Sequence, residues 1–238
     1  MTASKLRPND QRANLLVTLL WVSLIVQMIS MISTVFQYLL LRHVSQGNMI
    51  SMETAQANDL REQAIAILYL IVFIITAVFF IRWFRRGFFN MSQIHSNMSA
   101  SDGWTAGSWF IPIYSLYRPY QLMKEMFEVA QGWFNGKKEE GFKHNLELNK
   151  VSVWWTFWII SSILGQIVFR MSRGEGSVEQ MMNADLISIV NDLVAIPLTI
   201  FTVAMIKNFA AHEQQIFEFE AAPSPSIAFD DNEENNLL

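Results

Sequence analysis

Two pairs of charged and amide side chains lie around one stretch in the middle of the chain, residues 104–120. Arg86 and Asn90 are four residues apart and therefore share one face of a helix. Arg118 and Glu125 lie near the start of a later helix. An arginine guanidinium can donate two parallel hydrogen bonds to a phosphate. We therefore predict a pocket for an anionic headgroup or a small anion. The alternative is structural: Arg86 or Arg118 pairs with Glu125 and fixes the stretch in place.

An acidic side chain interrupts the last long apolar stretch of the chain. Asp192 follows Asn191 about six residues into that stretch. An ionisable group inside a membrane span is a candidate functional group, because its burial in hydrocarbon is costly unless it is paired or hydrated. We predict one of two arrangements. Either the two residues line a polar pathway, or Asp192 lies near the membrane surface, hydrated or paired with Arg170 or Arg173.

Three glutamines, Gln27, Gln37 and Gln166, also lie within apolar stretches. Amide side chains in membrane helices commonly form hydrogen bonds to neighbouring helices. We predict that role for all three. A permeation pathway lined by them would need more ionisable residues than these stretches contain.

Several classes of chemistry lack the residues that they need. The chain has no cysteine, which excludes disulfides and thiolate ligands. Its four histidines are far apart in sequence, none at the spacing of a ligand pair, and we predict no metal site and no cofactor. Serine-nucleophile and zinc-protease motifs are absent, so the sequence gives no support for an enzyme. The basic residues lie next to the ends of apolar stretches, and we predict no nucleic-acid partner.

Composition places the chain in a membrane. Of its 238 residues, 52% are hydrophobic and only 16% are charged, below the quarter typical of soluble domains. Four apolar stretches are long enough to cross a bilayer, which needs about 20 residues. They predict an all-α, polytopic fold with spans at about 13–41, 64–84, 151–169 and 186–206.

The distribution of positive charge predicts the topology. With four spans, 13 of the 17 lysines and arginines lie on the side of the two termini and four lie on the other side. A fifth span at residues 104–120 would distribute them evenly. Because lysine and arginine are enriched in cytoplasmic loops, we predict four spans with both termini in the cytoplasm of a bacterial inner membrane.

The uncharged stretch that begins at Trp104 and Trp109 is therefore predicted not to cross. It is short for a span, and prolines interrupt it at Pro112 and Pro119. From Tyr120 onward, apolar residues recur at helical spacing. We predict a re-entrant or interfacial segment followed by an amphipathic helix, together spanning about 104–134.

The chain divides into a membrane domain and a tail. We predict a single membrane domain over residues 1–212. Residues 213–238 contain seven acidic and no basic residues, and two prolines. That composition predicts an acidic, disordered tail.

Four short motifs carry a resemblance to a known family. They are IRWFRRGFFN at 81–90, GWTAGSWFIP at 103–112, LYRPYQLMKE at 116–125 and VWW at 153–155. Together they resemble the signature blocks of the bacterial domain-of-unknown-function family 4328. Phe89 stands where that signature has a second basic residue. The resemblance implies a bacterial multi-span membrane protein and implies no activity.

These observations predict a non-enzymatic membrane module. Its partners would be membrane lipids, a second copy or another membrane protein, contacted through the arginine-rich and aromatic central segment on the cytoplasmic side. The alternative is a small oligomeric transporter or channel lined by Asp192 and the amide side chains of the spans. A third hypothesis is an enzyme acting on lipid-linked substrates, in which replacing Arg86, Arg118 or Glu125 would abolish a reaction.

Overall fold

The computed structural model describes residues 6–137, 141, 145–173 and 176–221. Within these residues the chain is helical and contains no strand. The elements are α1 (Asp10–Ser45), α2 (Met52–Ile94), α3 (Asp102–Gly107), the 3-10 helix η1 (Tyr114–Leu116), α4 (Arg118–Gly136), α5 (Leu148–Met171) and α6 (Val178–Ala221).

Four of these helices, α1, α2, α5 and α6, are long and apolar enough to cross a membrane. This confirms the predicted all-α fold with four candidate spans. At 1.5 Å per residue, the 43 residues of α2 and the 44 residues of α6 extend well beyond the predicted spans.

The extra length of α6 corrects one expectation. The helix continues to Ala221, so residues 213–221 belong to the folded bundle rather than to a disordered tail. Glu213 and Ile216 are buried there because they face other helices of the bundle. Residues 222–238 of the predicted tail lie outside the described residues.

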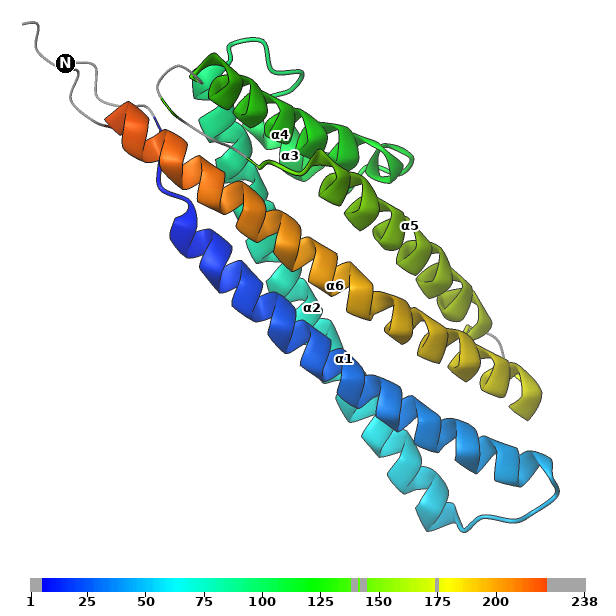
Figure 1. Ribbon diagram of the computed structural model, residues 1–238. Coiled ribbons are helices and arrows are strands. Elements are labelled where there is room, and N and C mark those ends of the chain that lie inside the picture. The colour runs from blue at the N-terminus through cyan, green and yellow to red at the C-terminus, as the bar shows by residue number, and fades with distance from the viewer. Residues whose placement is uncertain (1–5, 138–140, 142–144, 174–175, 222–238) are drawn as a thin grey trace, which may run out of the picture.

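The long helices pack in the order α2, α1, α6, α5. Helix α1 lies against α2 and α6, and α6 lies against α1 and α5. The start of α1 and the end of α6 lie at the same end of the bundle (Figure 1). We call this the terminal end, and the opposite end, where α1 is joined to α2 and α5 to α6, the loop end.

The hydrophobic core lies mainly at the terminal end, where α4 covers the ends of α2 and α6 (Figure 1). The helix predicted after Pro119 is present, and its apolar side is fully buried by protein. The rings of Phe127 and Phe209, for example, lie 5.1 Å apart. The buried residues of α4 are Pro119, Leu122, Met123, Met126, Phe127, Ala130 and Phe134.

A glycine allows the close packing of α2 in this core. A Cβ atom on Gly87 would lie 2.9 Å from the Met126 sulfur and 3.1 Å from a ring carbon of Phe209. Those distances are shorter than ordinary van der Waals contact. The absence of a side chain at Gly87 therefore lets α2 approach α4 and α6.

Between α3 and α4 the chain forms an exposed apolar segment, residues 110–117. Phe110 is 75% exposed and Ile113 is 72% exposed. Ile113 also has a φ of 71°, in the left-handed region that β-branched residues rarely adopt. The chain therefore turns sharply at this point, between the prolines Pro112 and Pro119.

Candidate functional site

A cleft of about 630 Å³ lies among α1, α2, α5 and α6. This volume is within the range of small-molecule sites. Helices α2 and α5 form its sides and do not pack against each other along their length, whereas α1 and α6 lie behind them. The lining residues are Leu20, Ser23, Gln27, Tyr69, Val72, Phe73, Thr76, Ala77, Phe80, Ile81, Trp109, Phe110, Trp154, Trp158, Ser161, Ser162, Gly165, Asn191, Ala195, Leu198, Thr199 and Thr202.

Aromatic rings close the cleft towards the terminal end. The Trp109 ring lies 5.6 Å from that of Phe80 and 5.5 Å from that of Trp158, in edge-to-face contacts. Phe80 and Trp154 join α2 to α5, with ring centroids 5.9 Å apart. Trp158 also stacks on Trp155 at 4.5 Å. The segment that carries Trp109 is thereby held against the spans.

Some polar groups of the cleft are paired within the protein. The hydroxyls of Ser23 and Thr76 are 2.8 Å apart and link α1 to α2. The Ser161 hydroxyl donates to Asn191 Oδ1 at 2.9 Å and links α5 to α6. Thr202 donates to the Leu198 carbonyl of its own helix. These contacts join neighbouring helices or satisfy single side chains.

Other polar groups of the cleft have no partner in the part of the chain that the structure describes. The Tyr69 phenol, the hydroxyls of Ser162 and Thr199, and the Asn191 amide nitrogen make no hydrogen bond with described residues. A polar group in hydrocarbon is costly unless it is paired. These groups are therefore available to a ligand.

Behind the cleft, Gln27 donates to Asp192 Oδ1 at 3.0 Å, and both side chains are 9% exposed. Gln37 likewise donates to Asp185 at 3.0 Å. Interhelical hydrogen bonding is thus confirmed for Gln27 and Gln37. Gln166 is exposed on α5 and makes no hydrogen bond within the described residues, because it points away from the neighbouring helices.

The alternative partners considered for Asp192 are not used. The Arg173 guanidinium lies 4.2 Å from the centre of the Phe169 ring, at the end of α5. Asp192 instead faces α1, where Gln27 satisfies one of its oxygens. Of the arrangements considered for Asp192, an ion pair with Arg170 or Arg173 is therefore not present among the described residues.

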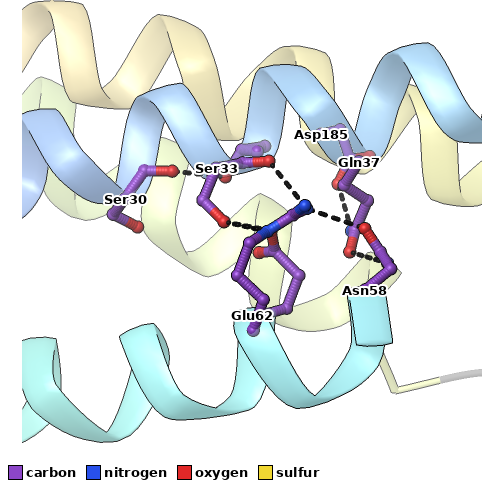
Figure 2. Close-up of polar contacts among 8 residues, drawn as sticks. Ser30, Ser33, Gln37, Asn58, Glu62 and Asp185 are labelled. Carbon is purple, nitrogen blue, oxygen red and sulfur yellow. Dashed lines mark hydrogen bonds and ion pairs between the residues drawn. The ribbon is translucent and has the colours of Figure 1, made fainter. Parts of the chain in front are cut away.

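A second polar network lies nearer the loop end and joins α1, α2 and α6 (Figure 2). The Arg61 guanidinium donates to the hydroxyl of Ser33 at 2.9 Å, to Asn58 Oδ1 at 2.7 Å and to Glu62 at 3.0 Å. Beside it, Asn58 donates to Gln37 at 3.3 Å, and Gln37 continues to Asp185. The network holds the three helices together where the predicted span of α2 begins.

Arg86 and Asn90 face a cluster at the terminal end that sequence reasoning did not identify. Glu213 of α6 is 5% exposed and accepts hydrogen bonds from Asn90 at 2.7 Å and from Asn9 at 2.9 Å. Asn90 also exchanges two hydrogen bonds with the backbone of Arg7. This Glu213 cluster ties the segment before α1 to the ends of α2 and α6.

Glu213 lies about 10 Å beyond Ile206, the end of the predicted span, at 1.5 Å per residue. Burial raises the pKa of the Glu213 carboxyl to about 7, although Asn9, Asn90 and the nearby Arg86 favour the charged form. Asn9 Oδ1 is buried without a partner in the part of the chain that the structure describes, and a cavity of about 10 Å³ adjoins it. That space is close to the volume that one water needs.

Arg118 and Glu125 belong to a different contact. Arg118 donates to the backbone carbonyl of Ser99 at 3.1 Å and to its hydroxyl at 3.0 Å. Glu125 accepts from the backbone N–H of Ser99 at 2.6 Å. The two side chains thus hold the connection between α2 and α3, and they do not share a pocket with Arg86 and Asn90.

The remaining predicted residues are divided between buried and exposed positions. Trp104 and Pro112 are exposed. Pro119 is buried in the first turn of α4. Tyr120 stacks on Trp155 and its hydroxyl lies 3.1 Å from that of Ser152. Of all the residues predicted as site candidates from the sequence, Trp109, Gln27 and Asn191 line the cleft.

Sequence reasoning missed Glu213, Asn9, Tyr69 and Thr199. A usable signal existed for Glu213, because Phe209, Glu213 and Ile216 continue the helical spacing of α6 beyond the predicted span. No comparable signal marks Tyr69 or Thr199, which are ordinary members of apolar helices.

The comparisons with known proteins give one match. The chain matches a domain of unknown function, DUF4328, over residues 46–211, from the loop between α1 and α2 to the last third of α6. No curated protein and no solved structure matches the chain. The matched residues include most of the cleft and make up more than half of the chain. The chain therefore belongs to the DUF4328 family.

Proposed function

We propose that this protein is a non-enzymatic module of the bacterial inner membrane that holds a lipid-class molecule in the cleft among its spans. The observation that carries the proposal is the set of polar groups that line the cleft without a protein partner. A bilayer offers no water at this depth to satisfy them. A bound amphiphile would supply both the apolar contact and the missing hydrogen bonds.

The distribution of charge supports an orientation with both termini in the cytoplasm. Arg82, Arg85 and Arg86 lie on α2 at the terminal end, whereas the loop end has few basic residues. The exposed apolar segment 110–117 is close to this basic region, since α3 packs against α2 and Arg85 forms an ion pair with Asp102. That segment would contact the cytoplasmic leaflet, in agreement with the predicted re-entrant or interfacial position.

Binding agrees better than conduction with the shape of the cleft. The contacts of Phe80, Trp109 and Trp154 close it at the terminal end, and Asp192 is held by Gln27 behind the lining. A transporter would need a route past these rings. We therefore infer a lateral entrance between α2 and α5, because these helices do not pack against each other along their length.

Filling the cleft tests the proposal. Gly165 lines the cleft and a Cβ atom there would meet nothing within 4 Å, so Gly165→Leu would occupy the cleft without disturbing the fold. We expect the wild-type protein, purified in mild detergent, to carry a bound lipid-class molecule that organic extraction and mass spectrometry detect. The Gly165→Leu variant should lose most of it.

Gly132→Leu is the matched control. Gly132 also has open space around its Cβ position, but it lies on the exposed side of α4, away from the cleft. This variant should retain the bound molecule at the wild-type level. Equal amounts in the wild type and in Gly165→Leu would refute binding in the cleft.

A further inference from the structure

We propose that the occupant of the cleft is a prenylated quinone, a neutral molecule with a flat ring, carbonyl acceptors and a long apolar chain. This inference rests on the proposed function and specifies the ligand of the same site. Four properties of the cleft support it: its neutrality, its hydrogen-bond donors, its aromatic end and its lateral opening.

The cleft favours a neutral ligand. Within the described part of the chain, no lysine, arginine, aspartate or glutamate lines it. A phosphate or a free carboxylate would therefore be buried among apolar and uncharged groups, at a high cost in desolvation. Arg82 and Arg86 are outside the lining, so the cleft offers no partner for the headgroup of a phospholipid.

The unpaired polar groups of the cleft suit carbonyl acceptors. Asn191 Oδ1 already accepts the hydrogen bond of Ser161, so its amide nitrogen remains as a donor. The Tyr69 phenol and the Thr199 hydroxyl are further donors on α2 and α6. These donors are spread along the cleft, because Tyr69 is eleven residues from Phe80 on α2, about 16 Å, and Asn191 is eight residues from Thr199 on α6, about 12 Å. A quinone ring at the aromatic end can accept from Thr199, which lies two residues from Phe201, the ring that stacks on Phe157 of α5. This hydrogen bond requires no charge on the ligand.

The closed end of the cleft suits a flat ring. Trp109, Trp154 and Trp158 all line it, and they meet each other mainly edge to face or at a tilt. Aromatic rings in proteins favour such edge contacts and offset stacking, each with a gain beyond the burial of area. A quinone ring at this end would find indole surfaces around it, whereas the glycerol unit of a neutral lipid is not planar.

The apolar chain would leave through the side of the cleft. The α2 residues Val72, Phe73 and Ala77 line this part, and neighbouring side chains of α2 such as Ile74 and Val78 are exposed. An isoprenoid chain could extend along α2 into the bilayer. The volume of about 630 Å³ therefore has to hold only the ring and the first part of the chain.

The proposal is tested by titration with a decyl-substituted benzoquinone. The full chain is placed in lipid nanodiscs without quinone, and saturable quenching of tryptophan fluorescence reports binding, because three tryptophans line the cleft. We expect Thr199→Val to weaken binding about three- to tenfold, since the variant removes a single hydrogen bond at the aromatic end. Gly165→Leu should abolish saturable binding.

Thr156→Val is the matched control. Thr156 is exposed on α5, outside the cleft lining, and its hydroxyl bonds to the carbonyl of Ser152 in its own helix. This variant should bind the quinone as tightly as the wild type. An equal loss in Thr156→Val would mean that the quenching reports the state of the helix rather than the cleft, which overturns the proposal.

The remaining outcomes separate the two proposals. If Gly165→Leu releases a co-purified phospholipid or diacylglycerol while the quinone shows only non-saturable partitioning, the cleft binds a lipid and the quinone assignment is wrong. If neither a co-purified molecule nor saturable quinone binding responds to Gly165→Leu, both the quinone assignment and the proposed function fail. Quinone bound by the wild type and lost in Gly165→Leu is the expected result.

Discussion

Two polar regions of this protein differ in how their hydrogen bonds are completed. In the Glu213 cluster, the side chains come from three segments of the chain, and both carboxylate oxygens of Glu213 accept from asparagine side chains. In the cleft, by contrast, Tyr69, Thr199 and the Asn191 nitrogen have no partner within the described residues. Glu213 and Asn90 are buried, whereas Tyr69 and Asn191 are half-buried in the open cleft.

The difference separates a structural role from a binding role. A buried polar group that is paired within the protein fixes the relative positions of its helices, and its removal destabilises the fold. Unpaired groups that line an open cleft contribute little to the fold and gain from a ligand. We therefore expect substitutions in the Glu213 cluster to change stability and substitutions in the cleft to change binding.

The largest effect is expected for Glu213→Ala. The substitution leaves the buried amides of Asn9 and Asn90 without their acceptor and creates a cavity beside Phe209. The free energy of unfolding should fall by about 3 kcal/mol, the range for loss of a buried hydrogen-bonded carboxylate. Thermal unfolding of the purified protein in detergent, followed by circular dichroism, measures this change.

Glu218→Ala is the control for that experiment. Glu218 is exposed on the same helix, and among the described residues its carboxylate accepts only from Gln214, one turn away. Surface substitutions of this kind usually change stability by less than about 0.5 kcal/mol. Similar losses in the two variants would show that the end of α6 responds to any change, and the distinct role of Glu213 would have to be abandoned.

The pH dependence of stability gives a second, smaller effect in the same cluster. Burial raises the pKa of Glu213 from 4.5 to about 7, so the folded state binds a proton more tightly than the unfolded state does. The contribution of Glu213 to the free energy of unfolding is therefore fully present below pH 4.5. It is lost as the pH rises towards 7. The loss is on the order of 3 kcal/mol at most, and the unfolding temperature should fall between pH 5 and pH 8.

Glu213→Gln separates this contribution from those of other titrating groups. Glutamine has similar size and no charge to gain, so the variant should show a flatter pH profile whatever its absolute stability. Identical slopes for the wild type and for Glu213→Gln would mean that Glu213 keeps the same charge throughout this range.

The spans were predictable because their signal is local. Each is a long, mainly apolar run, and the run at 186–206 was recognisable despite Asp192 and Pro197. The end of α6 was misjudged because the acidic composition of 213–238 outweighed the helical spacing of Phe209 and Ile216.

The contacts of the sites were much less predictable than the spans. Glu213 forms hydrogen bonds with Asn9 and Asn90, which are 204 and 123 residues away in the sequence. No local sequence pattern indicates contacts between residues so far apart in the chain. Grouping Arg86 with Arg118 rested on their closeness in sequence to residues 104–120. The structure separates them because the connection between α2 and α3 turns Ser99 towards Arg118. The cleft between α2 and α5 was not predictable either, because it depends on how the four long helices pack in three dimensions, and the composition of each helix does not determine that.

The smallest effect is expected for the hydrogen bond between α1 and α6 behind the cleft. Gln27→Leu removes the donor to Asp192, and interhelical hydrogen bonds in membranes average about 0.6 kcal/mol, with a maximum of about 1.7 kcal/mol. Gln166→Leu makes the same change at an exposed position of α5 and should leave the unfolding temperature unaltered. A loss of about 3 kcal/mol for Gln27→Leu would place Asp192 with Glu213 among the structural groups. A loss near zero would show that this hydrogen bond does not hold α1 and α6 together.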